Sequence, residues 1–150
     1  MQIETKYTGK TTIDRENIIA FEHGVPSFEE EKEFILLPFS DSPSPFYILQ
    51  SVNTAGLAFV VMTPFQFFPQ YEAKLTDSVI EQLEIEDKND VAVFVILTLR
   101  DTLEKSTANL SGPIVINSRK QKGKQIVLSD TSYNTKHPLV QPAEAGRGER

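Results

Sequence analysis

The chain has 150 residues, and 15 Lys and Arg against 21 Asp and Glu leave a formal net charge of −6. This length suits one domain with a closed core. The acidic balance argues against nucleic acid as the direct partner, because proteins that bind phosphate backbones are usually basic. The sequence contains no cysteine, which excludes a disulfide scaffold, a thiolate metal site and a cysteine nucleophile.

The first ten residues lack the apolar core of a signal peptide, and no run reaches the ~18 apolar residues of a membrane span. We therefore expect a cytoplasmic protein with no membrane partner. The only two histidines are His23 and His137, and the known motifs for metal, nucleophilic or phosphate-loop chemistry are missing. The sequence thus predicts no enzyme, no metal and no other cofactor.

Short apolar runs are separated by nine prolines and seven glycines, a pattern that predicts strands rather than long helices. In the first half of the chain, strands are expected at residues 17–22, 34–37, 46–51 and 58–62. Ser27 is expected to cap a brief helical turn over residues 28–32. Its hydroxyl can accept a hydrogen bond from a free amide, and the glutamates favour the positive end of a helix.

In the second half, residues 71–75 alternate in polarity as a half-buried strand does. Ser78 and Glu81 match a capping box and predict a short helix. Residues 91–99 are nearly all apolar and predict a central strand covered on both faces. Residues 114–117 and 125–128 predict a hairpin whose loop spans 118–124.

Strands at this spacing predict a mainly β fold, a small antiparallel β-barrel-like single domain with one or two short helices. We expect this domain over residues 1–138, followed by a flexible polar C-terminal tail at 139–150. Because residues 91–99 are expected to be internal rather than an exposed edge strand, we also expect a monomer.

Charge is segregated along the chain. Residues 22–33 hold five acids and one lysine, residues 72–90 hold seven acids and two lysines, and residues 100–124 hold six bases and two acids. Such segregation is compatible with ordinary solubility. As a functional feature, it predicts an acidic face that docks a basic protein.

Aromatic residues are concentrated between Pro64 and Pro69, where three of the ten phenylalanines lie, with Tyr71 shortly after. So short a segment cannot bury all of them. Either they plug one end of a barrel, or one or two stay exposed as anchors for a protein partner.

Two other functions are open on the residues alone. The basic loop at 119–124 suits an RNA-binding barrel, although no aromatic residue interleaves it to stack bases. A barrel pocket lined by Gln50, Glu72 and Asn109 would suit a small ligand-binding or enzymatic barrel.

A series of short motifs, in order and spacing, resembles the bacterial flagellar assembly factor FliW family over about residues 2–138. They include Phe-Glu-His-Gly-Val-Pro-Ser-Phe at 21–28, Ala-Phe-Val-Val at 58–61, Phe-Phe-x-x-Tyr at 67–71, Pro-Ile-Val-Ile-Asn at 113–117 and Gln-Ile-Val-Leu at 125–128. Ser27 departs from the family pattern, which often has glycine there, and Gln70 stands where aspartate is frequent.

This resemblance implies a non-enzymatic regulator of flagellum biogenesis with a small β-barrel-like fold. In the family, the protein binds flagellin and also CsrA, the RNA-binding carbon storage regulator that represses flagellin translation. Abundant flagellin occupies the factor and frees CsrA, whereas export of flagellin releases the factor to sequester CsrA.

Two sets of residues are candidates for binding these partners. A helical terminal segment of flagellin would need an apolar groove, for which the aromatic candidates are Tyr47, Phe65, Phe67, Phe68 and Tyr71. Basic CsrA would need an acidic surface, for which the candidates are Glu72, Glu81, Glu84, Glu86 and Asp87. We expect the antagonism of CsrA to be partly electrostatic and to weaken with salt.

Overall fold

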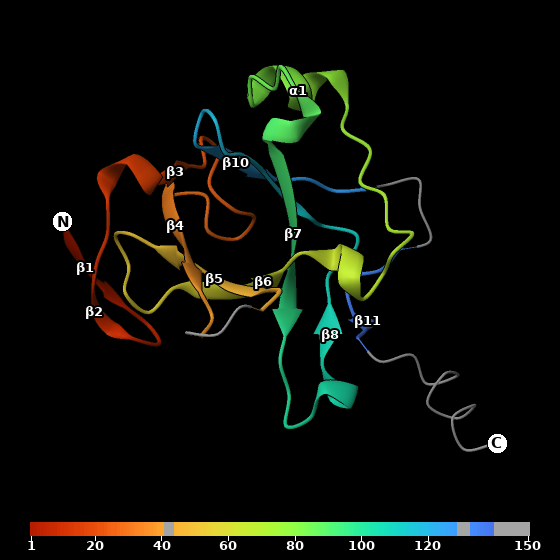
Figure 1. Cartoon of the computed structure of the whole chain (residues 1–150), viewed down its shortest axis with the longest axis horizontal. Coiled ribbons are helices and arrows are strands. Elements are labelled where there is room, and N and C mark those ends of the chain that lie inside the picture. Colours follow the sequence, from red (N-terminus) through yellow and green to blue (C-terminus); the bar gives the residue numbers. More distant parts are fainter. Residues whose placement is uncertain (41–43, 129–132, 140–150) are drawn as a thin grey trace.

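The computed structural model describes residues 1–40, 44–128 and 133–139, and its centre is a β-barrel (Figure 1). Seven strands close the barrel, in the order β9 (Ile114–Asn117), β10 (Lys122–Gln125), β3 (Ile19–Ala20), β4 (Glu33–Pro38), β5 (Phe46–Ser51), β6 (Ala58–Met62) and β7 (Val91–Thr98). Strand β7 pairs back to β9. Neighbours are antiparallel except β3 and β10, which are parallel and meet at Ala20 and Lys122. The predicted mainly β barrel is confirmed, with a parallel pair at its closure.

Short elements flank the barrel. The hairpin of β1 (Gln2–Thr5) and β2 (Gly9–Thr12) packs through Ile3 and Ile13 onto Ile35 of β4. Strand β8 (Thr107–Ala108) continues the sheet from β7, and β11 (His137–Pro138) pairs with β8. These four strands were not predicted, because they are polar or only two residues long.

The helical elements of the described residues are also short. They are α1 (Asp77–Gln82) and the 3-10 helices η1 (Arg15–Asn17), η2 (Pro64–Gln66), η3 (Lys88–Asp90) and η4 (Leu103–Lys105). None of the described helices is long and apolar enough to span a bilayer.

Strand β7 explains how the core is divided. Phe94 packs inside the barrel with Phe21 and Phe34, whereas Val95 and Leu97 pack in a second cluster outside it. Alternate side chains of a strand point to opposite faces, so both faces of β7 are covered. The prediction of a central strand at residues 91–99 is confirmed for Val91–Thr98, whereas Leu99 lies beyond the strand and is 43% exposed.

Two predictions in the first half were wrong. Residues 17–22 form a strand only at Ile19–Ala20, because η1 precedes it and the chain turns after Phe21. No helix forms at residues 28–32, where a single turn is closed by the amide of Glu31, which donates to the carbonyl of Phe28 at 3.0 Å. Instead, the amide of Phe28 donates to the carbonyl of Val25 at 2.7 Å, and Ser27 between them has φ 73°. Ser27 is therefore a residue of a tight turn and not a helix cap.

Two expectations about residues 71–83 also need correction. Residues 71–75 have the expected alternating burial but form no strand, since the amide of Tyr71 donates to Phe68 and that of Glu72 to the Tyr133 hydroxyl. The helix is present, but its N-cap is Thr76, whose hydroxyl accepts from the amide of Val79 at 3.2 Å. Ser78 lies inside the helix.

The predicted hairpin is present with a different second arm. Strand β10 is Lys122–Gln125 rather than residues 125–128, so the loop shortens to residues 118–121. Gln121 adopts φ 55°, which allows this tighter turn. The predicted tail at 139–150 lies, except for Leu139, outside the described residues.

Candidate protein-binding surfaces

The acidic segment around α1 folds against the basic hairpin of β9 and β10. Lys122 forms an ion pair with Glu84, and Arg119 lies 3.9 Å from the carboxylate of Asp90. The hydrogen bond from Lys122 lowers the pKa of Glu84 and raises that of Lys122. Lys124 donates to the amide oxygen of Gln82 at 2.6 Å. Three of the four basic residues that suggested RNA binding, Arg119, Lys122 and Lys124, thus contact the protein's own acidic and polar groups.

A groove of about 560 Å³ lies between η2, α1 and the first residues of β7. In Figure 1, the chain leaves β6 for η2 beside β7 and then returns to α1. Phe65 and Ile80 are 46% and 36% exposed at the groove. Glu86 and Asp87 line it together with Lys88. The apolar lining is completed by Ala73, Leu75, Ile85, Val91, Ala92 and Val93.

A second hollow, of about 440 Å³, has an aromatic lining that includes Phe67, Phe68, Tyr133 and His137. The His137 ring meets Phe68 edge-on, with centroids 5.2 Å apart. The Nδ1 atom of His137 is buried and has no hydrogen-bond partner within the described part of the chain. Phe67 and Phe68 are only partly buried, so this hollow offers aromatic surface to a partner.

Tyr71 and Tyr47 both contribute to packing, to different extents. Tyr71 is 4% exposed, and its hydroxyl donates to the carbonyl of Leu110 at 2.7 Å. Burial raises the pKa of Tyr71 far above its ordinary value. Tyr47 is partly buried and packs against the barrel core, with its ring 5.6 Å from that of Phe94. Of the five aromatic candidates, Phe65 is the most exposed, and Tyr47, Phe67 and Phe68 keep part of their surface accessible.

The acidic candidates divide in a similar way. Glu84 is paired with Lys122, whereas Glu72, Glu81, Glu86 and Asp87 are exposed and form no ion pair with any described residue. The structure brings Phe65, Glu86 and Asp87 to one groove. Phe67, Phe68 and Tyr71 line the aromatic hollow instead.

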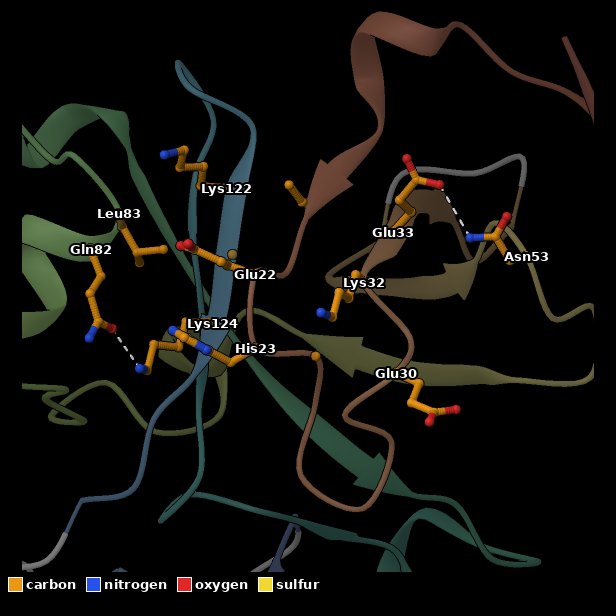
Figure 2. A pocket seen from close by; sticks show the side chains of 13 residues that line it. Glu22, His23, Glu30, Lys32, Glu33, Asn53, Gln82, Leu83, Lys122 and Lys124 are labelled. Atoms are coloured by element: carbon orange, nitrogen blue, oxygen red, sulfur yellow. Dashed lines mark hydrogen bonds between the residues drawn. The ribbon is translucent and has the colours of Figure 1, made fainter.

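A third hollow, of about 500 Å³, lies between β10, the end of α1 and the loops around β3 (Figure 2). Its lining mixes acids, lysines and amides. Several of these are already bonded to one another: Lys124 to Gln82, and the Asn53 amide to Glu33 at 3.2 Å.

The residues expected for a small-ligand site are not brought together. Gln50 is completely buried, and its amide nitrogen donates to backbone carbonyls of the 51–57 turn. The side-chain oxygen of Asn109 accepts from the amide of Gly112 at 2.9 Å, and Glu72 is exposed. Gln50 and Asn109 therefore shape loops, and none of the three lines the third hollow.

Sequence reasoning missed the apolar lining of the groove. Ile80 could have indicated an exposed apolar surface. Val79 and Leu83 lie on the buried face of the helical segment, and Ile80 does not lie on that face. The remaining groove residues come from β7 and from the segments before and after α1, so their convergence depends on the fold.

Known proteins resemble this chain in both sequence and fold. Residues 2–139 match the family model described as FliW protein. The flagellar assembly factor FliW of Geobacillus kaustophilus (strain HTA426) is 53% identical over 139 residues, covering 93% of this chain and 95% of the relative. That of Bacillus subtilis (strain 168) is 51% identical over 139 residues, covering 93% and 96%.

The flagellar assembly factor FliW of Shouchella clausii (strain KSM-K16) is 48% identical over 147 residues, covering 98% of this chain and all of the relative. A crystal structure of the flagellar assembly factor FliW superposes with a TM-score of 0.89 at 50% identity, covering 94% of this chain and 98% of the other. Sequence, length and fold agree over nearly the whole chain, which therefore belongs to the FliW family of flagellar assembly factors, a family without enzymatic activity.

Proposed function

We propose that this protein binds flagellin and, when free of flagellin, binds CsrA and so relieves repression of flagellin translation. The observation that carries the proposal is membership of the FliW family, with 51–53% sequence identity to two relatives over 93% of the chain. The family resemblance implies both partners. The surfaces described above support binding of proteins, since the exposed Phe65 lines the same groove as the unpaired Glu86 and Asp87.

Flagellin is proposed to contact the accessible aromatic residues. Phe65 lies on η2, and Phe67 and Phe68 follow it before the chain turns at Pro69. Aromatic side chains contribute large contact areas and are enriched at protein interfaces. An amphipathic helix from a flagellin terminus would bury this surface against its apolar face.

CsrA is proposed to contact the acids that the basic hairpin leaves unpaired. Glu84 and Asp90 pair with Lys122 and Arg119, which leaves five other acids and two lysines in residues 72–90. A basic partner is attracted to such a surface. Once bound, the acidic protein would oppose the approach of RNA to CsrA.

The action is proposed to take place in the cytoplasm, where flagellin is translated, and in the monomeric state. Closure of the barrel supports a monomer, because β7 and β9 pair and join the two ends of the sheet. A closed barrel has few strand edges with which a second copy could pair.

A calorimetric titration tests the proposal. Purified protein is titrated with flagellin, with CsrA, and then with flagellin in the presence of CsrA. Binding of both proteins, with CsrA displaced by flagellin, is the expected result. Binding of neither would overturn the proposed partners, and binding of both at once would overturn the switch.

A further inference from the structure

We propose that the edge of β7 at Val91 and Val93 is a docking site for an extended segment of the basic partner, which adds a short strand to the barrel. The inference rests on the proposed function, since that basic partner is CsrA. It goes further by placing the contact in the groove between η2, α1 and β7, and by specifying backbone pairing as its chemistry.

The hydrogen-bond pattern identifies the open edge. The amide of Ser118 donates to the carbonyl of Asp90, and Val91 lies opposite Asn117. In an antiparallel ladder, hydrogen-bonded and non-hydrogen-bonded pairs alternate. Ala92 and Phe94 therefore bond to β9, whereas the peptide groups of Val91 and Val93 point to the opposite side of β7.

On that opposite side, β6 ends too early to pair with them. Strand β6 contacts β7 through Val61 with Ile96 and Met62 with Val95, so continuing this register would place Pro64 opposite Val93. Proline has no amide hydrogen to donate, and Pro64 begins η2 instead.

Backbone groups of Val91 and Val93 in the groove are therefore available for hydrogen bonds with a partner. The Val91 amide already donates to the carbonyl of Lys88. The carbonyl of Val91 and both the amide and the carbonyl of Val93 form no backbone hydrogen bond with any described residue. Such an edge is a template for β-strand addition, in which backbone bonds supply affinity and alternate side chains enter flanking pockets.

The surroundings of the edge indicate the kind of segment. Leu75, Ile85 and the exposed Ile80 and Phe65 line the groove, so alternate side chains of the partner should be apolar.

The acidic edge of the groove supplies the charge. The basic hairpin pairs Glu84 and Asp90, which leaves Glu86 and Asp87 to line the groove beside Lys88. Oδ1 of Asp87 accepts from the amide of Asn89, so Glu86 is the carboxylate with no hydrogen bond among the described residues. A lysine or arginine flanking the partner's apolar residues would complement it.

Amide hydrogen exchange tests the inference by NMR. In the free protein, we expect the Val93 amide to exchange at least tenfold faster than the amides of Ala92 and Val95, which lie within strand pairing. Saturating CsrA should slow exchange at Val93 at least tenfold. Fast exchange at Val93 with and without bound CsrA would overturn the docking site, and slow exchange in the free protein would show that the edge is already covered.

Charge variants supply a second measurement. Glu86→Lys should weaken CsrA binding at least tenfold. The matched control is Glu29→Lys, which changes the net charge equally at another exposed acid, and it should change affinity by less than threefold. Equal effects of the two variants would overturn the groove as the contact.

Other occupants give distinct results. Protection of Val93 that depends on protein concentration would assign the edge to a second copy, and protection by flagellin alone would assign it to flagellin; either overturns the inference. If neither CsrA nor flagellin binds the wild type, the proposed function fails. A model peptide of alternating valine and threonine flanked by lysines then probes the edge directly, and unprotected Val93 at saturating peptide overturns the docking site.

Discussion

Ser27 and Gly24 both adopt left-handed backbone, with φ of 73° and 68°. A side chain at such a position costs about 1–2 kcal/mol, whereas glycine avoids the clash. At Gly24, a Cβ atom would lie 2.5 Å from the backbone of Glu29. The glycine that the family often has at position 27 thus matches the backbone observed here.

We expect Ser27→Gly to stabilise the protein by up to about 1 kcal/mol, because it removes strain and costs only some unfolded-state entropy. Gly24→Ser should destabilise it by more than about 2 kcal/mol, since the new side chain meets backbone. Urea unfolding of both variants checks this. A lower midpoint for Ser27→Gly would contradict the assigned turn.

Glu31 shows that the acidic run at 29–31 is more than a solvated surface. Its carboxylate accepts hydrogen bonds from the hydroxyls of Ser51 and Thr54 at 2.5 and 2.7 Å. These bonds lower the pKa of Glu31 from 4.5. They attach the loop before β4 to the turn after β5.

Stability should therefore depend on pH at Glu31. Because the pKa is lower in the folded state, the contribution is present above about pH 4.5 and is lost as the pH falls through the lowered value. Glu31→Gln should cost about 1 kcal/mol at pH 7 and progressively less towards pH 3. Unfolding free energies across this range provide the measurement, with Glu30→Gln as control. If the difference in unfolding free energy between wild type and Glu31→Gln did not change with pH, the loss would come from packing rather than from the charge of Glu31.

At the scale of elements, the parallel contact of β10 with β3 is tightly packed. Gly123 lies over Phe21, and an added Cβ would approach the ring to 2.6 Å. Phe21 is completely buried and packs against Phe34, with ring centroids 5.1 Å apart, so a shift of the ring would disturb other core residues.

Gly123→Ala should destabilise the protein by about 2–3 kcal/mol, since overpacking displaces either Phe21 or β10. Adding Phe21→Leu should recover part of this loss, because the smaller side chain leaves room. A double-mutant cycle by urea unfolding measures the coupling. Additive losses would mean that the two residues do not share the contact.

The segment from η2 to α1 depends on Tyr71, which connects it to Leu110. Tyr71→Phe removes one buried hydrogen bond, so we expect a loss of about 1–2 kcal/mol in unfolding free energy with unchanged flagellin affinity. Unfolding and calorimetry on the same variant check both. Loss of affinity without loss of stability would instead place Tyr71 in the partner surface.

Whether a strand could be predicted from the sequence depended on how much of it is apolar and on whether another strand pairs with it. The strands at 34–37, 46–51, 58–62 and 91–99 were recognisable because most of their residues are apolar and covered by the core. Residues 71–75 carried an equally clear alternating pattern, but no strand among the described residues pairs with them to form a ladder. The β1–β2 hairpin gave little apolar signal, since Thr and Lys dominate it.

At the scale of the whole molecule, opposite charges are arranged in two different ways. Some acids pair with the basic hairpin, as Glu84 does with Lys122, and others face solvent. We expect these groups to contribute unequally to binding a basic partner, because a paired carboxylate already has its counter-charge.

Neutralising the unpaired acids with Glu81→Gln and Glu86→Gln should weaken CsrA binding by about three- to tenfold at low salt and flatten its salt dependence. Glu84→Gln should change the affinity by less than about twofold. Titrations at two ionic strengths provide the comparison. A further variant neutralises Glu81, Glu84, Glu86 and Asp87 together. If its CsrA affinity and salt dependence were unchanged, binding would not depend on these charges.

The sequence by itself determined the mainly β class, the principal strands and the family resemblance. Each depends on local patterns: apolar runs, prolines and glycines at turns, and short motifs in a fixed order. Side-chain periodicity reports which residues must be buried, and it does so without knowledge of neighbouring strands.

Only the tertiary structure decided which residues meet. It paired Glu84 with Lys122, buried Tyr71 against Leu110, joined β3 and β10 in parallel and ended β6 at Met62, two residues before Pro64 begins η2 beside an open edge of β7. These outcomes depend on strand register and on contacts between residues far apart in the chain. Local patterns do not encode them, because the same apolar strand can pair with different neighbours until the whole core is packed.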